Sequence, residues 1–175
     1  MIASYLIRRY LKSVLSITFI SIPLITNAAV YSNGSKTTTF DVTMGVVADC
    51  TIATSAMDFG AARGVLSTAL SATSNINVIC TNTTPYNLGL NAGTGAGSSG
   101  TTRYMSGTGS NTGTVRFHLF QALGTTPWGD TQGTNTQGGT GNGTQQTLTV
   151  FGEIPAQNAP TPDSYKSTIT ATVYF

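Results

Sequence analysis

Residues 40–48 read FDVTMGVVA, and this stretch decides the fold because apolar side chains alternate with small or polar ones. The apolar positions share one face of an extended chain: Phe40, Val42, Met44, Val46 and Ala48. The opposite face carries Asp41, Thr43 and Gly45. A repeat of two residues is typical of a β-strand with one buried face. The pattern therefore predicts a strand over residues 40–48.

The same alternation recurs along the chain, and no window of twelve residues shows a helical apolar stripe. It predicts further strands at Ile76–Cys80, Tyr86–Leu90, Val115–Phe120, Leu148–Val150 and Ile169–Phe175. Turn-rich segments separate them at Asn91–Gly100, Ser106–Gly113 and Gly129–Gly143. Several short strands with such spacing favour an all-β sandwich in one domain.

Charge is scarce: 8% of the 175 residues are charged, with a formal net charge of +2. Arg8, Arg9 and Lys12 account for three of the eight basic residues. From Ala29 onward five basic residues face six acidic ones, a net charge of −1. Nucleic-acid binding needs a basic patch, and these scattered cations do not form one. We therefore expect no nucleic-acid partner.

The N-terminus has the organisation of a signal peptide over residues 1–28. A basic segment precedes an apolar run, Ser13–Ile25, and small residues follow it. Cleavage after Ala28 places Thr26 and Ala28 at the recognition positions, and cleavage after Ala29 is the second choice. The alternative is a membrane anchor, but a spanning helix needs about 20 apolar residues and Pro23 interrupts this run. We expect export of the mature chain.

Export changes the interpretation of the two cysteines, Cys50 and Cys80. An oxidising compartment favours a disulfide between them. Closing a loop of about 31 residues stabilises a fold by about 3–4 kcal/mol in the chain-entropy model. Metal binding or nucleophilic catalysis would need histidine partners, and His118 is the one histidine in the sequence. We expect a structural disulfide and no metal site.

Other candidate sites favour structural interpretations, so neither an enzyme nor a cofactor is expected. The sequence contains no G-x-S-x-G, and neither Asp58 nor Glu153 has an apparent carboxylate partner. His118 is expected to be a polar residue on the face opposite Val115, Phe117 and Leu119. Trp128 beside Asp130 could stack on a sugar, but a buried or corner-packing tryptophan is favoured.

The segment Gly95–Gly100 matches G-x-G-x-x-G, the pattern of dinucleotide-binding loops. That loop must open a helix whose N-terminus meets the pyrophosphate. Here Thr101–Gly107 follows, with no helical continuation. In a chain with 20 glycines an accidental match is expected. We expect no nucleotide and no other small-molecule substrate.

Several short motifs, in order, resemble a known family. They are Ala48–Ile52, Met57–Gly60, Ile76–Thr81, Pro85–Gly93, the Arg103/Met105 pair, Thr126–Asp130, Leu148–Pro155 and Tyr165–Phe175. Each motif alone is weak, but their order and spacing resemble a spore coat protein U domain, the subunit type of archaic (Csu-type) chaperone–usher pili. The resemblance extends over about Phe40 to Phe175.

The resemblance implies an incomplete immunoglobulin-like β-sandwich that lacks its last strand. Residues 29–48 would form an N-terminal extension, and residues 49–175 the pilin domain. The donor strand would present Phe40, Val42, Met44 and Val46 to a neighbouring subunit. The acceptor groove would lie along the last strand, at Ile169, Ala171, Val173 and Phe175. The last apolar run ends at Phe175, and we expect no closing strand after it.

The function implied is that of a structural pilus subunit assembled by donor-strand complementation. Its partners would be a periplasmic chaperone, an outer-membrane usher and neighbouring subunits, and the fibre on the cell surface would support adhesion and biofilm formation. A single domain with a donor segment favours a shaft or adaptor position over a tip adhesin. The alternatives are a secreted coat or matrix protein and a sugar-binding adhesin module of the same fold.

Overall fold

A computed structural model describes residues 33–61 and 66–175 of the chain. The chain divides into two units, Met1–Thr43 and Met44–Phe175, which we describe separately. The signal peptide expected over residues 1–28 lies outside the described residues. In the first unit, residues 33–43 form neither helix nor strand. The second unit contains all the described strands.

Residues 44–49 of the second unit also form no strand, so the strand predicted over residues 40–48 is wrong for the isolated chain. The alternating pattern indicates a face suited to burial. A strand also needs a second segment that satisfies its backbone N–H and C=O groups. The side-chain pattern is therefore not sufficient for strand formation here.

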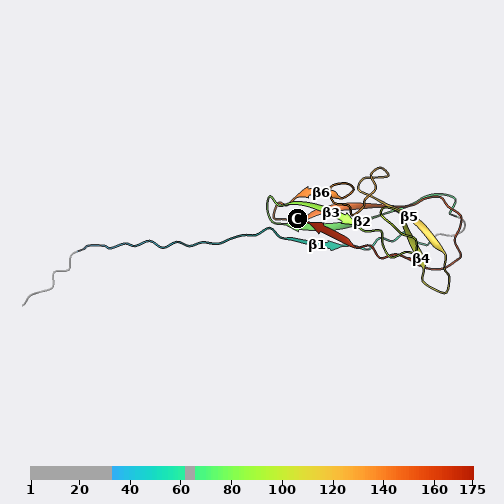
Figure 1. Ribbon diagram of the computed structural model, residues 1–175, viewed down its shortest axis with the longest axis horizontal. Coiled ribbons are helices and arrows are strands. Elements are labelled where there is room, and N and C mark those ends of the chain that lie inside the picture. The colour runs from blue at the N-terminus through green and yellow to red at the C-terminus, as the bar shows by residue number, and fades with distance from the viewer. Residues whose placement is uncertain (1–32, 62–65) are drawn as a thin grey trace, which may run out of the picture. The chain divides into compact units, whose positions relative to one another are not determined.

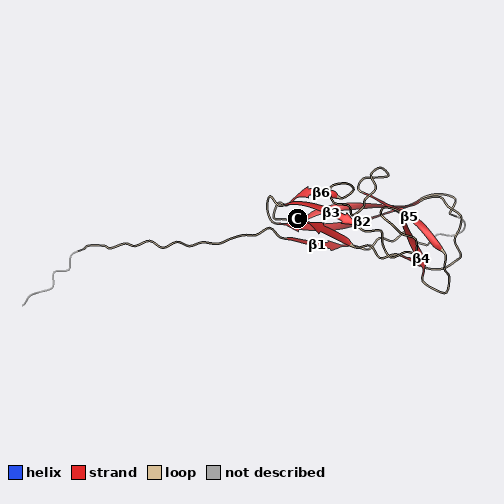
Figure 2. Cartoon of the chain, in the orientation of Figure 1, coloured by secondary structure: helices blue, strands red, loops and turns tan. Residues whose placement is uncertain are grey.

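The rest of the second unit is built from strands and loops, and Figure 2 shows no helix in the described residues. Its nine described strands are β1 (Cys50–Thr54), β2 (Leu70–Cys80), β3 (Pro85–Leu90), β4 (Arg103–Gly107), β5 (Thr114–Phe120), β6 (Gln137–Thr140), β7 (Gln146–Ile154), β8 (Tyr165–Lys166) and β9 (Ala171–Tyr174). The described residues thus include no helix long and apolar enough to cross a membrane. The all-β prediction is confirmed.

The strands form two antiparallel sheets (Figure 1). One has six strands in the order β1-β2-β7-β5-β4-β8, and the other has three in the order β6-β3-β9. Apolar side chains from both sheets form one buried cluster: Leu66, Ile76, Val78, Cys80, Tyr86, Leu88, Leu90, Val115, Phe117, Leu119, Trp128, Val150 and Ile154. Since one core takes side chains from both sheets, the two sheets pack face to face as a sandwich.

One strand lies inside a segment predicted to be a turn, and a second overlaps such a segment by two residues. β6 lies within Gly129–Gly143 and pairs with β3, while β4 extends to Gly107 at the start of Ser106–Gly113. Strand β6 has the sequence QGGT, which carries no apolar alternation. Gly139 instead lies against the Tyr86 ring, where an added Cβ would come within 2.4 Å of a ring carbon. The glycine is needed for close packing, so the apolar pattern misses this strand.

A buried arginine joins the two sheets. Arg103 at the start of β4 has no exposed surface, and its Nε donates to the Asn91 carbonyl at 2.9 Å. Its Nη2 donates to the carbonyls of Leu90 and Trp128, each at 2.7 Å. Burial lowers the pKa of Arg103 to about 10, with Asp130 acting in the opposite direction. The side chain therefore stays protonated at neutral pH and connects β4 to the end of β3.

A candidate groove at the sheet edges

The final strands of the chain each have an outer edge that no described strand occupies. β9 is the last strand of the three-stranded sheet and pairs only with β3. β8 is the last strand of the six-stranded sheet and pairs only with β4. β1 occupies the other edge of that sheet, and its Cα atoms come within 8 Å of those of β9. Unpaired strand edges are templates for pairing with another chain.

Two cavities open beside these edges. The larger is about 830 Å³, and segments 57–61 and 159–165 contribute to its lining. The smaller is about 550 Å³, and its lining includes residues from 54–59 and 166–171. Both are lined by Met57, Phe59 and Met105. We call the two cavities together the groove.

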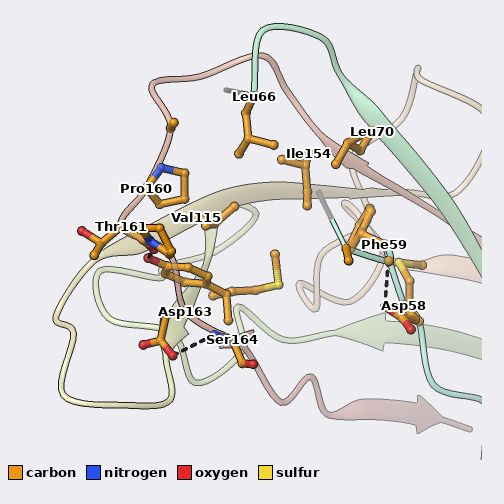
Figure 3. Close-up of a pocket in the computed structure, with 17 residues that line it drawn as sticks. Asp58, Phe59, Leu66, Leu70, Val115, Ile154, Pro160, Thr161, Asp163 and Ser164 are labelled. Carbon is orange, nitrogen blue, oxygen red and sulfur yellow. Dashed lines mark hydrogen bonds between the residues drawn. The ribbon is translucent and has the colours of Figure 1, made fainter. Parts of the chain in front are cut away.

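The lining of the groove is largely apolar. In Figure 3, Leu66, Val115 and Ile154 lie between the loop that carries Pro160 and the segment that carries Phe59. The smaller cavity is lined by Ile76, Leu90, Phe117, Leu119 and Val150, all of which belong to the buried core. The groove is therefore an opening onto the core, where an apolar ligand would complete the packing.

Met57 and Phe59 lie over the core because β7 has a glycine beneath them. A Cβ at Gly152 would come within 2.2 Å of the Met57 Sδ and 2.8 Å of the Phe59 ring. Both side chains are half-buried and pack against the core. The alternating motif Met57-Asp58-Phe59 is part of the family resemblance, and the structure adds Met57 and Phe59 to the groove.

The polar residues at the rim of the groove are engaged by their own loops. The Asp58 carboxylate accepts a hydrogen bond from the Gly60 N–H at 2.8 Å. The Asp163 carboxylate accepts from the N–H groups of Ser164 at 2.7 Å and Gly109 at 3.1 Å. These bonds hold the two carboxylates within the conformation of their own loops. Among the described residues, no group of three or more possible metal ligands occurs.

The four residues expected to line the acceptor groove divide into two pairs. Ile169 and Ala171 line the smaller cavity. Val173 packs against the core without lining either cavity, and Phe175 is 58% exposed. The groove instead includes Met57, Phe59 and Met105, which come from elsewhere in the chain. The structure thus places half of the expected set at the groove.

The four residues expected on the donor face are among the most exposed apolar side chains described. Phe40 is 83% exposed, Val42 and Met44 are each 85% exposed, and Val46 is 73% exposed. Large apolar side chains at this exposure are costly in water and mark a segment suited to burial against a partner.

The expected disulfide is present. Cys50 and Cys80 are bonded, and they are directly opposite each other in the pairing of β1 with β2. The bond joins the first residue of β1 to the last residue of β2. It therefore lies where the extension enters the domain.

The structure decides three other interpretations. Trp128 has no exposed surface, and its Nε1 donates to the Leu88 carbonyl at 2.8 Å, so it is a buried packing residue. His118 is half-buried on the face opposite the core, as expected. Burial lowers the pKa of His118, and the positive charge of Arg116 lowers it further. Gly95–Gly100 leads into a turn closed by bonds between Ser99 and Thr102, so the helix that a dinucleotide loop needs is absent there.

Comparison with known proteins agrees with this architecture. A family model described as Spore Coat Protein U domain matches residues 36–172, and this domain family is structural and not enzymatic. A search of curated proteins finds no match.

Two solved structures are similar to the chain. One is a chain of the CsuC–CsuE chaperone–tip adhesion subunit pre-assembly complex from archaic chaperone-usher Csu pili of Acinetobacter baumannii. The identity is 22% and the TM-score 0.56 over 74% of this chain, which spans only 40% of the matched chain. The second is the minor tip subunit HdaB of the E. coli Hda pilus, with 17% identity, a TM-score of 0.37 and coverage of 71% and 79% of the two chains. The first similarity supports the pilin-like fold.

Proposed function

Since the chain belongs to the Spore Coat Protein U domain family, we propose that it is a structural subunit of a chaperone–usher pilus, assembled by donor-strand complementation. The observation that carries the proposal is the unpaired outer edge of β9 beside an apolar groove that opens onto the core. A sandwich that lacks one strand would have these two features together. The similar Csu structure, which contains a chaperone and a pilus subunit, supports the same assignment.

The donor in this proposal is the extension of a neighbouring copy or a related subunit. Phe40, Val42, Met44 and Val46 would enter the groove, and their backbone would pair with the edge of β9. Each buried side chain contributes about 1.5–3 kcal/mol, while ordering the donor costs about 1–2 kcal/mol per residue. The net gain is small beside these opposing terms, so the persistence of the fibre rests on slow release of the strand.

The proposal also assigns partners and a location. A free groove and an exposed donor are both prone to wrong pairing, so a periplasmic chaperone would cover the groove until an outer-membrane usher exchanges it for a donor. The mature chain would then lie in a pilus outside the cell, where fibres support adhesion and biofilm formation. A sugar-binding role centred on Trp128 is not proposed because that side chain is fully buried.

The proposal is tested by comparing Val42→Asp with Thr43→Asp. Val42 lies on the apolar face, so an aspartate there would carry an unpaired charge into the groove at a cost of several kcal/mol. We expect Val42→Asp to abolish fibres while the chaperone complex forms in normal amounts. Thr43 points to the opposite face, and Thr43→Asp should reduce fibre yield much less.

Both species are quantified for each variant, as chaperone complex in the periplasm and as fibre on the cell surface. Met44→Asp is a second variant on the apolar face and should behave as Val42→Asp does. If Val42→Asp removes the chaperone complex as completely as the fibre, residues 40–48 are part of the subunit's own fold, and the donor assignment is wrong.

A further inference from the structure

The disulfide lies within a wider set of contacts at the base of the extension. Asp49 and Thr81 each lie one residue beyond a bridge cysteine, and two hydrogen bonds join them. The Asp49 carbonyl accepts from the Thr81 N–H at 2.9 Å, and the Asp49 N–H donates to the Thr81 hydroxyl at 3.2 Å. The pairing between the residue before β1 and the turn after β2 therefore continues one residue beyond the covalent bond. Residues 33–49 are all exposed, so the exposed segment ends at Asp49, directly before the bridge.

The Cys80 side of the bridge is tied to a second turn. The Gly143 N–H donates to the Cys80 carbonyl at 3.0 Å. The Gly141 carbonyl accepts from the Thr83 N–H at 2.9 Å, and the Gly141 N–H donates to the Thr84 carbonyl at 2.7 Å. Gly141 also packs directly on the bridge, since a Cβ there would come within 2.7 Å of the Cys80 Cβ. We call residues 49–50, 80–84 and 141–143 the anchor.

The anchor reaches both sheets at once. Residues 80–84 connect β2 of the six-stranded sheet to β3 of the three-stranded sheet. Residues 141–143 belong to the connection, 141–145, between β6 of the smaller sheet and β7 of the larger one. A force applied at Cys80 is therefore shared among four strands that lie in both layers.

β1, by contrast, is a short strand at the edge of its sheet. It is a five-residue edge strand that pairs only with β2, whereas β2 has eleven residues and pairs with both β1 and β7. An antiparallel pair pulled at one end opens one residue pair at a time. Opening from Cys50 would end at Thr54, which lines the groove together with the following Met57 and Phe59.

We infer that the anchor is a tension-transmitting device that passes a pull on the extension directly to both sheets and keeps β1 unloaded. With the bridge closed, the covalent path runs from Asp49 through Cys50 and Cys80 to Thr81, and residues 51–79 carry no tension. The groove wall at 54–59 would then keep its shape under load. The inference rests on the proposed function, because it is in a fibre that the extension is pulled.

The test is single-molecule force spectroscopy on residues 29–175, pulled between the two ends with the synthetic peptide 36–48 in solution. The bridged chain should unfold in one step. Cys50→Ala/Cys80→Ala should show an earlier step at lower force that releases the five residues of β1, about 18 Å of extended chain. Its total released length should exceed that of the bridged chain by about 100 Å, since the bridge spans 30 residues.

Leu88→Ala is the matched control, because Leu88 is fully buried in β3 and lies outside both the anchor and the groove. It should lower the unfolding force and keep the single step, which separates loss of stability from loss of the tension path. If the double variant does not fold, reduction of the folded wild-type chain with a phosphine makes the same comparison and should produce the early step.

A bridge-free or reduced chain that unfolds in one step, at the force of the bridged chain, would overturn the inference. An early step in Leu88→Ala would also overturn it. These readouts need a folded domain but no donor insertion. Failure of the proposed function would instead appear as peptide 36–48 having no effect on the domain, whatever the pattern of steps.

Discussion

Residues 40–46 and residues 169–175 have the same kind of sequence and different structures. In both, apolar side chains alternate with polar or small ones. The first segment forms no strand, and its apolar side chains are at least 73% exposed. The second contains β9, which pairs with β3 along one edge, and Ile169, Ala171 and Val173 pack against the core.

The difference shows what a period-two pattern specifies. It fixes which face of a segment is suited to burial, but it does not identify the partner that buries it. For residues 169–175 the partner is β3 and the core of the same chain. For residues 40–46 we propose that the partner is another subunit, and the predictions below depend on this distinction.

The largest contrast is expected when the same substitution is made in the two segments. Val173 packs against the core, so Val173→Asp should lower the free energy of unfolding by about 3 kcal/mol. Val42 is 85% exposed, so Val42→Asp should change it by less than about 0.5 kcal/mol. Urea unfolding of both variants, with wild-type peptide 36–48 supplied, measures the two values. Similar losses would mean that both segments belong to one core.

A smaller effect is expected when the groove is filled from outside. Residues 49–175 alone should be unstable or self-associate, because the edge of β9 and the groove are left open. Peptide 36–48 at 100 times its dissociation constant should stabilise the domain by about 2.7 kcal/mol. Thermal unfolding and size-exclusion chromatography measure both properties.

The control is the same peptide with Val42→Asp, which should give no stabilisation. A monodisperse domain with a high melting temperature, unchanged by the wild-type peptide, would show that the sandwich is complete by itself. The two segments would then differ for a reason other than a missing strand.

The smallest effect on stability is expected from a fall in pH. It concerns the domain, where His118 lies, and not residues 40–46. Burial, then Arg116, lowers the pKa of His118 below its usual value of 6.5, with Glu153 acting in the opposite direction. His118 therefore binds its proton more tightly in the unfolded chain than in the folded one. Its contribution to the free energy of unfolding is fully present above pH 6.5 and is lost as the pH falls below that value. His118→Gln should reduce this loss between pH 6.5 and 5, as followed by urea midpoints. An unchanged pH dependence would assign the loss to other groups.

The fold could largely be predicted from sequence wherever burial sets the pattern. β3 and β5 match their predicted ranges closely because their inward residues are apolar at every second position, as at Val115, Phe117 and Leu119. Only residues 76–80 of β2 and 148–150 of β7 are predicted, because the rest of these strands lacks a continuous apolar alternation. β6 was missed because its contribution is the close approach of Gly139 to Tyr86, which leaves no apolar signal. The strand predicted over Ile169–Phe175 is shorter in the structure, where β9 covers Ala171–Tyr174 and pairs with β3. Residues 167–170 form no strand and separate β9 from β8, which pairs with β4 in the other sheet.

The candidate site was predictable in part, for a related reason. Ile169 and Ala171 were identified because they belong to an alternating run. Met57, Phe59 and Met105 were not assigned to the groove because their role depends on the fold, which brings two segments to one opening. The disulfide was predicted from cysteine count and export, but its place at the start of β1 could be known only from the strand register.

Few residues can replace Arg103 without loss of stability. Its guanidinium supplies hydrogen bonds to three carbonyl oxygens from one buried position. Lysine concentrates its donors at a single nitrogen, and methionine fills the space but leaves three acceptors without a donor. Residues 122–126, by contrast, are all exposed and face no such demand. We therefore expect most substitutions at residues 122–126 to be tolerated and most substitutions of Arg103 to destabilise the fold. Distant relatives should differ at that loop long before they differ at Arg103.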